Sequence, residues 1–231
     1  MRVQIRSAHP LENVVIDVRE GPLYGVLGRP PGASSLVVFA HGTGSSRFSP
    51  RNQYVAAALR SAGLATLLFD LLTPEESARE AGLECPGIAL ERLAGRLQRV
   101  SAWVAAQRSL RPLRLGYFGA STGAAAALLA AAHDPGRVQA IVSRGGRPDL
   151  VSDALPLVQA PTLLIVGARD EQVIALNEGA RARMRAPVEL VLVPGAGHLF
   201  QEGNSLERVA ELSTRWFKQY LSATPQPLPG R

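Results

Sequence analysis

The feature that most constrains the fold of this chain is a pentapeptide at residues 119–123, GASTG, that joins two apolar segments of different kinds. Segment 113–118 has the composition of a buried strand, and segment 124–129 is an alanine-rich helix former. A strand that passes into a helix so abruptly needs a sharp turn, which glycines on both sides of Ser121 permit. Such a turn pushes the serine hydroxyl out above a sheet, as in a nucleophile elbow. The alternative is an ordinary helix start that Ser121 caps.

Two other strand-like segments end in polar residues that can serve a serine nucleophile. One ends at Asp170, and another runs into a Pro/Gly-rich loop that carries His198. The order Ser121, Asp170, His198 is that of the catalytic residues of α/β-hydrolases and differs from the chymotrypsin and subtilisin orders. Singly, Asp170 could cap a helix and His198 a loop, but together they indicate a catalytic triad. Asp149 and Asp153, which follow the preceding strand, are rivals for the acid; the strand-end loop before the histidine favours Asp170.

The loop after the apolar segment 36–40 supplies candidate oxyanion donors. Its sequence is HGTGSSR, and its glycines allow a substrate to approach the backbone closely. In this kind of site one backbone N–H comes from that loop and the other from the residue after the nucleophile. We therefore assign the donors to Thr43 and Thr122, with Gly44 as the alternative to Thr43. We expect His41 to brace the loop.

Two arginines are expected near the mouth of this site. Arg47 closes the loop just described, and Arg144 follows the strand predicted at 138–143. A guanidinium there can bind a substrate carboxylate through two parallel hydrogen bonds, which would select anionic esters or lactones. The alternative is structural: Arg47 pairs with a local carboxylate such as Asp70, and Arg144 caps loop carbonyls. The sequence somewhat favours the structural role, because an arginine-rich chain places some arginines near any site.

Strand-like and helix-like segments alternate along the chain. Such alternation gives a mainly parallel twisted sheet with helices on both faces, and sites then lie at the carboxyl ends of the strands. The first two strands form an antiparallel pair that turns at 20–22. We expect strands at 14–19, 23–27, 35–40, 64–70, 114–118, 138–143, 162–167 and 188–193, an edge strand at 3–6, and helices at 52–62, 88–108, after the 119–123 turn, at 173–184 and at 205–221.

One domain is expected. A chain of 231 residues suits one α/β domain with a sizeable core, which we place at 1–223. A Pro-rich flexible tail is expected at 224–231. The loops at 72–86 and 147–156 are candidates for a cap over the site.

Composition limits the expected partners and the compartment. The net charge of +6 comes from scattered arginines, since Lys218 is the only lysine, and no basic tract predicts nucleic-acid binding. The single cysteine, Cys85, excludes an internal disulfide. The first residues lack the apolar core of a signal peptide, and no segment approaches the roughly 20 apolar residues of a membrane span. We therefore expect a cytoplasmic protein that binds neither nucleic acid nor membrane; the oligomeric state stays open.

The chain resembles the α/β-hydrolase superfamily over nearly its full length, and more narrowly the dienelactone hydrolase-like family. The resemblance is carried by residues 41–47, 69–75, 119–123 and 143–149. It implies the α/β-hydrolase fold and the same three residues as nucleophile, acid and base. Dienelactone hydrolases carry cysteine in the elbow, where this chain has Ser121, and this departure favours ordinary serine esterase chemistry. Similar domains occur fused to a phosphoribosyltransferase domain, which we do not find in this sequence.

The expected activity is that of a carboxylic ester hydrolase. It would cleave a small-molecule ester or lactone through an acyl-enzyme, with no metal or organic cofactor. A serine peptidase or thioesterase would use the same parts, and a non-catalytic binding protein on this scaffold is a further alternative, since fold alone does not give function.

Overall fold

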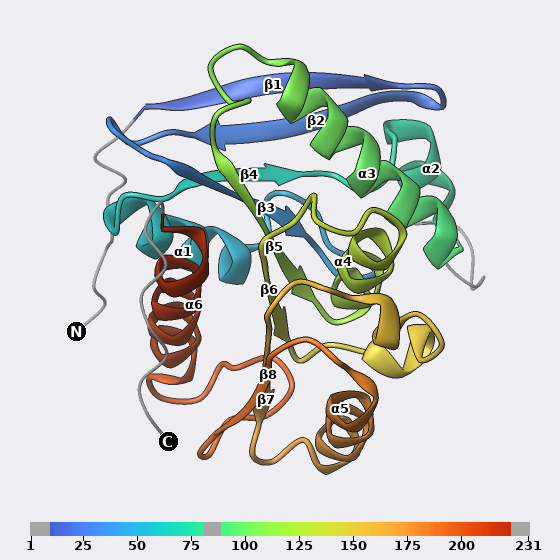
Figure 1. Cartoon of the computed structure of the whole chain (residues 1–231), viewed down its shortest axis with the longest axis vertical. Helices are drawn as coiled ribbons and strands as arrows, with labels where there is room; N and C mark the ends of the chain where they lie inside the picture. Colours follow the sequence, from blue (N-terminus) through green and yellow to red (C-terminus); the bar gives the residue numbers. More distant parts are fainter. Residues whose placement is uncertain (1–9, 81–88, 223–231) are drawn as a thin grey trace.

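Eight strands form one mixed sheet in the computed structural model, which describes residues 10–80 and 89–222 (Figure 1). Their order across the sheet is β1-β2-β4-β3-β5-β6-β7-β8. β1 pairs antiparallel with β2, β2 pairs antiparallel with β4, and all remaining pairs are parallel. The strands are β1 (Leu11–Val18), β2 (Gly21–Gly28), β3 (Ser35–Ala40), β4 (Ala65–Phe69), β5 (Arg114–Ala120), β6 (Ala140–Arg144), β7 (Thr162–Gly167) and β8 (Val188–Val193). The predicted fold class is confirmed.

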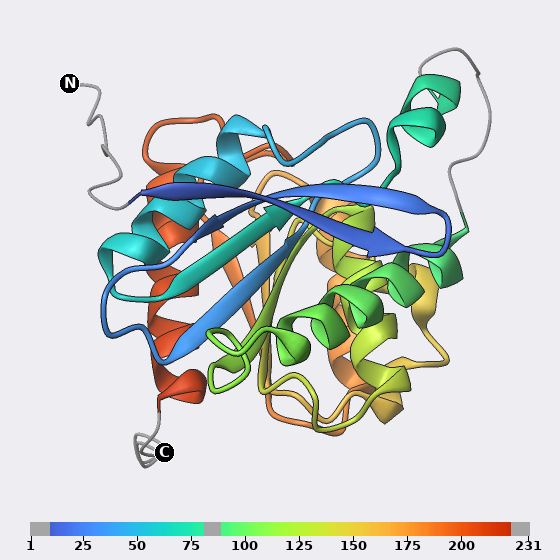
Figure 2. The ribbon, with the colours of Figure 1, turned by 90° about the horizontal axis from the view of Figure 1, so that it is seen from above.

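Helices cover both faces of this sheet. α1 (Pro50–Ser61) and α6 (Ser205–Leu221) pack against each other on one face. α3 (Leu90–Ala106), α4 (Thr122–His133) and α5 (Glu171–Arg183) lie on the other face (Figure 1). The view from above in Figure 2 shows the same separation of α1 and α6 from α3 and α4. The sheet is thus the middle of three layers.

The sheet is apolar on both faces because helices cover both. Every residue of β3, β4 and β7 is buried. The residues of α4 from Gly123 to Ala132 are all buried too, and their small side chains let this helix lie close to the sheet. Under α3, the Tyr117 hydroxyl lies 2.6 Å from Ser101 Oγ, and burial raises the pKa of Tyr117 to about 12. This phenol is therefore a neutral core residue.

The predicted boundaries agree with the structure at β3, β7, β8 and α6, and differ by a few residues elsewhere. One difference concerns the site: β6 ends with Arg144, which pairs with Ala120 and Ile165, so this arginine belongs to the strand rather than to the loop after it. The edge strand expected at 3–6 and the tail expected at 224–231 lie outside the described residues.

Two segments expected as loops contain helices. In 147–156 there are two short 3-10 helices, η1 (Pro148–Val151) and η2 (Leu155–Leu157), which lie against α4. The segment after β4 contains α2 (Pro74–Glu80), which stands at the rim of the molecule in Figure 2. Neither helix-forming stretch was expected, and both loop predictions are corrected in this respect.

A capping box begins α2. The Thr73 hydroxyl accepts the N–H of Glu76 at 3.3 Å, and the Glu76 carboxylate accepts the N–H of Thr73 at 2.9 Å. The buried guanidinium of Arg96, on α3, donates to the Leu71 carbonyl at 2.5 Å and to Glu76 Oε1 at 2.6 Å. These bonds fasten α2 to α3. The sequence TPEE held the signal, with proline in the first turn of the helix.

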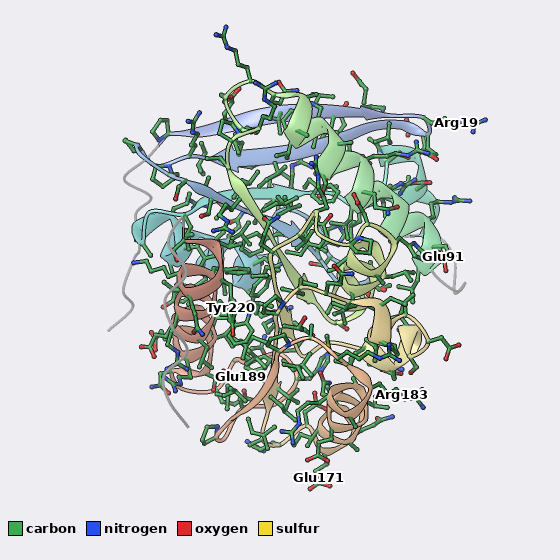
Figure 3. All side chains as sticks on the ribbon, viewed as in Figure 1. Arg19, Glu91, Glu171, Arg183, Glu189 and Tyr220 are labelled. Carbon is green, nitrogen blue, oxygen red and sulfur yellow. The ribbon has the colours of Figure 1, made fainter. Side chains whose placement is uncertain are left out.

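Charged side chains lie all around the outline of the molecule (Figure 3). The labelled residues Arg19, Glu91, Glu171 and Arg183 stand at its periphery. Within residues 10–80 and 89–222, no helix combines the length and apolar character that crossing a membrane requires.

Candidate active site

Ser121 occupies the turn between β5 and α4. Its backbone has φ 51° and ψ −123°, which residues other than glycine rarely adopt and which costs about 1–3 kcal/mol. A Cβ added to Gly119 would lie 2.3 Å from Cα of Ala124, and one added to Gly123 would lie 2.3 Å from O of Ala40. Only glycine fits these two contacts. The serine side chain makes no capping hydrogen bond to α4, so the turn has the geometry of an elbow rather than of a simple cap.

His198 and Asp170 form a hydrogen-bonded pair. Nδ1 of His198 lies 2.7 Å from Oδ2 of Asp170. Asp170 holds the N-cap position just before α5, yet its side chain makes no capping bond to that helix; its carboxylate is turned to the imidazole instead. The histidine side chain is 40% exposed and that of the aspartate 15%, so the ring is open to a reactant while the carboxylate is largely shielded.

The two rival carboxylates lie elsewhere. Asp149 accepts two hydrogen bonds of 2.8 Å from the guanidinium of Arg147. Asp153 lies between η1 and η2. The imidazole of His198 is bonded to Asp170, as the order along the chain predicts.

The end of β6 contacts both the elbow and the histidine. The N–H of Ser121 donates to the Arg144 carbonyl at 3.2 Å. A Cβ added to the next residue, Gly145, would lie 3.5 Å from Cε1 of His198. On the other side of the elbow, a Cβ added to Gly42 would lie 3.2 Å from Cβ of Ser121. The predicted nucleophile, base and oxyanion loop therefore meet at the carboxyl ends of the strands.

The oxyanion loop is joined to the elbow by a pair of threonines. The N–H of Thr43 donates to Oγ1 of Thr122 at 2.9 Å, and the two hydroxyls also lie 2.9 Å apart. The structure thus brings together the two residues predicted to donate to an oxyanion. The sequence could not reveal that the Thr122 hydroxyl already accepts the Thr43 N–H.

His41 braces this loop, as expected. Its Nε2 accepts the N–H of Leu71 at 2.9 Å, and its Nδ1 lies 2.9 Å from the Gly42 carbonyl. The ring is buried. It connects the loop after β3 to the segment after β4.

The two arginines expected at the mouth differ in their surroundings. Arg47 is paired with Asp70: its N–H donates to Oδ1 at 2.7 Å and its Nη1 to Oδ2. Its guanidinium also lies 4.2 Å from the centre of the Phe48 ring. These contacts match the structural alternative for Arg47. Arg144 is 7% exposed and pairs with no carboxylate of the described residues.

A pocket of about 400 Å³ adjoins the oxyanion loop. His41, Ser45 and Ser46 line it from that loop, and Pro74, Ser77 and Ala78 line it from α2. Its walls therefore include a helix that the sequence did not predict, although the capping-box sequence at its start could have identified it.

Comparison with known proteins shows the family of this chain. Residues 33–218 match the family described as alpha/beta hydrolase domain. The chain is 52% identical over 214 residues to a Mycobacterium tuberculosis protein named "Putative phosphoribosyl transferase Rv0571c". The match covers 92% of this chain but 47% of that protein, so the chain spans about half the length of this curated relative.

Solved structures agree on the fold. A dienelactone hydrolase from Anabaena variabilis is 50% identical, with a TM-score of 0.90, over 93% of this chain and 99% of that one. Est1E from Butyrivibrio proteoclasticus is 17% identical with a TM-score of 0.75, over 89% of this chain and 97% of that one; it supports the fold alone. With the family match, the elbow and the mixed sheet in agreement, the chain belongs to the alpha/beta hydrolases and is dienelactone hydrolase-like.

Proposed function

We propose that this chain is a serine hydrolase that cleaves carboxylic esters or lactones through an acyl-enzyme on Ser121. The observation that carries the proposal is the 2.7 Å bond between His198 and Asp170 at the same end of the sheet as the strained elbow. A base held by a largely shielded carboxylate, next to a half-buried serine in the elbow turn, is the arrangement that acyl transfer requires. The similarity to a protein named dienelactone hydrolase supports an ester or lactone as substrate.

The reaction proceeds in two steps. Nε2 of His198 takes the proton of the Ser121 hydroxyl as its oxygen attacks the carbonyl carbon, and the imidazolium then protonates the leaving alcohol. Asp170 holds the ring in the tautomer with the proton on Nδ1 and stabilises the imidazolium. In the second step His198 activates a water, which releases the carboxylic acid and restores the serine.

Backbone N–H groups stabilise the oxyanion of each tetrahedral intermediate. The donors are those of Thr122 and Thr43, and each is worth about 3 kcal/mol in sites of this kind. Because the Thr43 N–H is bonded to the Thr122 hydroxyl in the resting site, the oxyanion takes the place of that hydroxyl as acceptor. Gly44 remains the alternative donor from the same loop.

Replacement of the nucleophile tests the proposal. Ser121→Ala is expected to keep the fold and lower kcat for p-nitrophenyl esters by at least about 10³-fold, because the members of a triad act as a unit. Ser152→Ala, in the η1 region, is the control and retains full turnover. A fluorophosphonate probe labels wild type and Ser152→Ala at one site and leaves Ser121→Ala unlabelled. Retention of more than about a tenth of wild-type kcat in Ser121→Ala contradicts the nucleophile assignment.

A substrate panel distinguishes an esterase from a thioesterase or a peptidase that uses the same mechanism. Esters of varied acyl length, lactones, thioesters and peptide anilides are compared by kcat/KM on one preparation. We expect the highest values for esters or lactones. A preference for thioesters or anilides would agree with the proposed mechanism but would contradict esters or lactones as the substrate class.

A further inference from the structure

Arg144 carries a buried positive charge within the framework of the proposed site. Its backbone carbonyl accepts the N–H of Ser121, and its neighbour Gly145 contacts the ring of His198. The residue is buried, with 7% of its surface exposed. The backbone of Arg144 is thus bonded to the proposed nucleophile, and the residue that follows it contacts the proposed base.

This guanidinium has no partner among the described residues. Nε and Nη1 of Arg144 are buried without a hydrogen-bond acceptor, and no carboxylate lies within ion-pair distance. Other buried arginines do have partners: Arg96 donates to a carboxylate and a carbonyl, and Arg60 donates to Thr66 Oγ1 at 2.9 Å. Arg144 thus lacks the hydrogen-bond acceptors that Arg60 and Arg96 have for their guanidinium groups.

The side chain of Arg144 leaves β6 on the face that α1 covers. Side chains alternate along a strand, so Arg144 points to the same side as Ala140 and Val142. Both belong to the hydrophobic cluster that contains Val55 and Ala56 of α1. The first turn of that helix, where Arg51 and Asn52 stand, begins just after the oxyanion loop.

A second cation lies close by. Burial, together with the charge of Arg51, lowers the pKa of Arg144 to about 10, so the guanidinium is still charged at neutral pH. Nε of Arg51 and Oδ1 of Asn52 are also buried without a partner. Unpaired N–H donors of two cations and one unpaired amide oxygen thus lie at the end of β6 and the start of α1, and no carboxylate of the described residues is paired to Arg144.

A buried charge without a counter-charge is unfavourable, and an anionic ligand relieves the imbalance. We propose that Arg144, with Arg51 beside it, binds an anionic oxyacid group, a carboxylate or a phosphate, carried by the substrate. That the group belongs to the substrate rests on the proposed function; the anion site itself does not. Arg47, which already has Asp70, takes no part.

Binding of small anions tests the site without turnover. Calorimetric titration of wild type with succinate, inorganic phosphate and neutral succinamide compares charge at similar size. We expect at least one of the anions to bind tenfold more tightly than succinamide, and the better one identifies the oxyacid. Arg144→Met lowers anion affinity at least tenfold, whereas Arg208→Gln, on the exposed side of α6, binds as wild type does. Affinity of wild type for both anions no higher than for succinamide overturns the proposal, as does anion binding that survives Arg144→Met.

Stability separates ligand binding from a structural role. Without anion, Arg144→Met is expected to melt no lower than wild type, because no bond of the described protein is lost. A melting temperature several degrees lower, with anion binding intact, assigns Arg144 to the scaffold and overturns the proposal. If Arg144→Met does not fold, Arg51→Gln decides: anion affinity at least threefold weaker upholds the site, and unchanged affinity overturns it.

Kinetics connects the site to the substrate. On p-nitrophenyl hemisuccinate and its neutral methyl ester, wild type should favour the anion at least tenfold in kcat/KM, and Arg144→Met should lose that preference, measured as the ratio of the two esters on one preparation. Turnover of both esters at equal rates refutes the substrate anion while the proposed esterase activity stands. Arg144-dependent anion binding in a protein that cleaves no ester refutes the esterase and keeps the anion site.

Discussion

At the scale of single residues, the bond between Asp170 and His198 decides which ring nitrogen carries the proton. Because Nδ1 lies 2.7 Å from a carboxylate oxygen, the neutral ring keeps its proton there. Nε2 is left with a lone pair, which is the form that a general base needs. The largely shielded carboxylate also keeps the ring from rotating, so the base is oriented before substrate arrives.

This arrangement predicts that removal of the imidazole abolishes turnover. In His198→Gln no side chain is left to accept the serine proton, so kcat for a neutral ester should fall by at least about 10³-fold. The measurement is steady-state hydrolysis of a p-nitrophenyl ester by a variant whose circular dichroism matches that of wild type. Retention of more than about a tenth of wild-type kcat means that His198 is not the base.

The sequence predicts the position of a candidate site residue best where that position follows from the strand it ends. Ser121, Asp170 and His198 each stand at a strand end, and strand ends meet at one edge of a parallel sheet. The partners of Arg47 and the bond of the Thr43 N–H depend on side-chain rotation instead. For that reason the sequence leaves a structural and a binding role open for Arg47, and the folded protein has it paired with Asp70.

At the scale of elements, α2 shows how a polar network positions one wall of the pocket beside the oxyanion loop. The helix has seven residues, too few to be stable alone. Its carboxylate Glu76 both caps its own start and accepts a hydrogen bond from buried Arg96. Burial alone would raise the pKa of Glu76, but the bonds from Arg96 and from the Thr73 N–H outweigh burial, and the net pKa is lowered. Strand patterns were predicted well because they are apolar. The capping-box sequence of this short helix was visible, but its bond to Arg96, 20 residues further along the chain, depends on tertiary packing that the sequence does not show.

Glu76→Gln should therefore destabilise the fold in a pH-dependent way. We expect a loss of about 2 kcal/mol at pH 7, as for a hydrogen bond to a charged group, seen as a melting temperature lower by roughly 4–8 °C. A lowered pKa means that the stabilisation is present above the pKa of the unfolded carboxyl and disappears as pH falls through the folded value. The difference from wild type should thus shrink below about pH 4.

The neighbouring Glu75→Gln provides the control, because Glu75 is exposed in the same turn. It should change the melting temperature little at any pH. A loss for Glu76→Gln that persists unchanged in acid would show that the carboxylate charge is not what fastens α2.

At the scale of the whole molecule, one continuous sheet separates two hydrophobic layers. One layer packs under α3 and α4, and the other under α1 and α6. Both layers are built on the same strands, with successive residues facing opposite sides. Neither layer can lose its strands without the other losing them too.

The shared sheet predicts one cooperative unfolding transition. Calorimetry should give equal calorimetric and van't Hoff enthalpies, with a heat-capacity increase of roughly 3 kcal/mol/K, from 12–15 cal/mol/K per residue. Circular dichroism and tryptophan fluorescence should follow the same curve. Two separated transitions would show that the domain predicted at 1–223 is divided.

The contact of Gly123 with the end of β3 has a consequence for how such a protein can change over generations. A Cβ on Gly123 would lie within 2.4 Å of two successive carbonyl oxygens, those of Ala40 and His41, so the elbow and the oxyanion loop form a single rigid joint. Substitutions there are barred by sterics rather than by chemistry. New substrate preferences must arise in parts with more freedom, such as the α2 wall of the pocket. Mutational tolerance is thus divided unequally: the joint preserves the reaction, while its surroundings are free to vary the substrate.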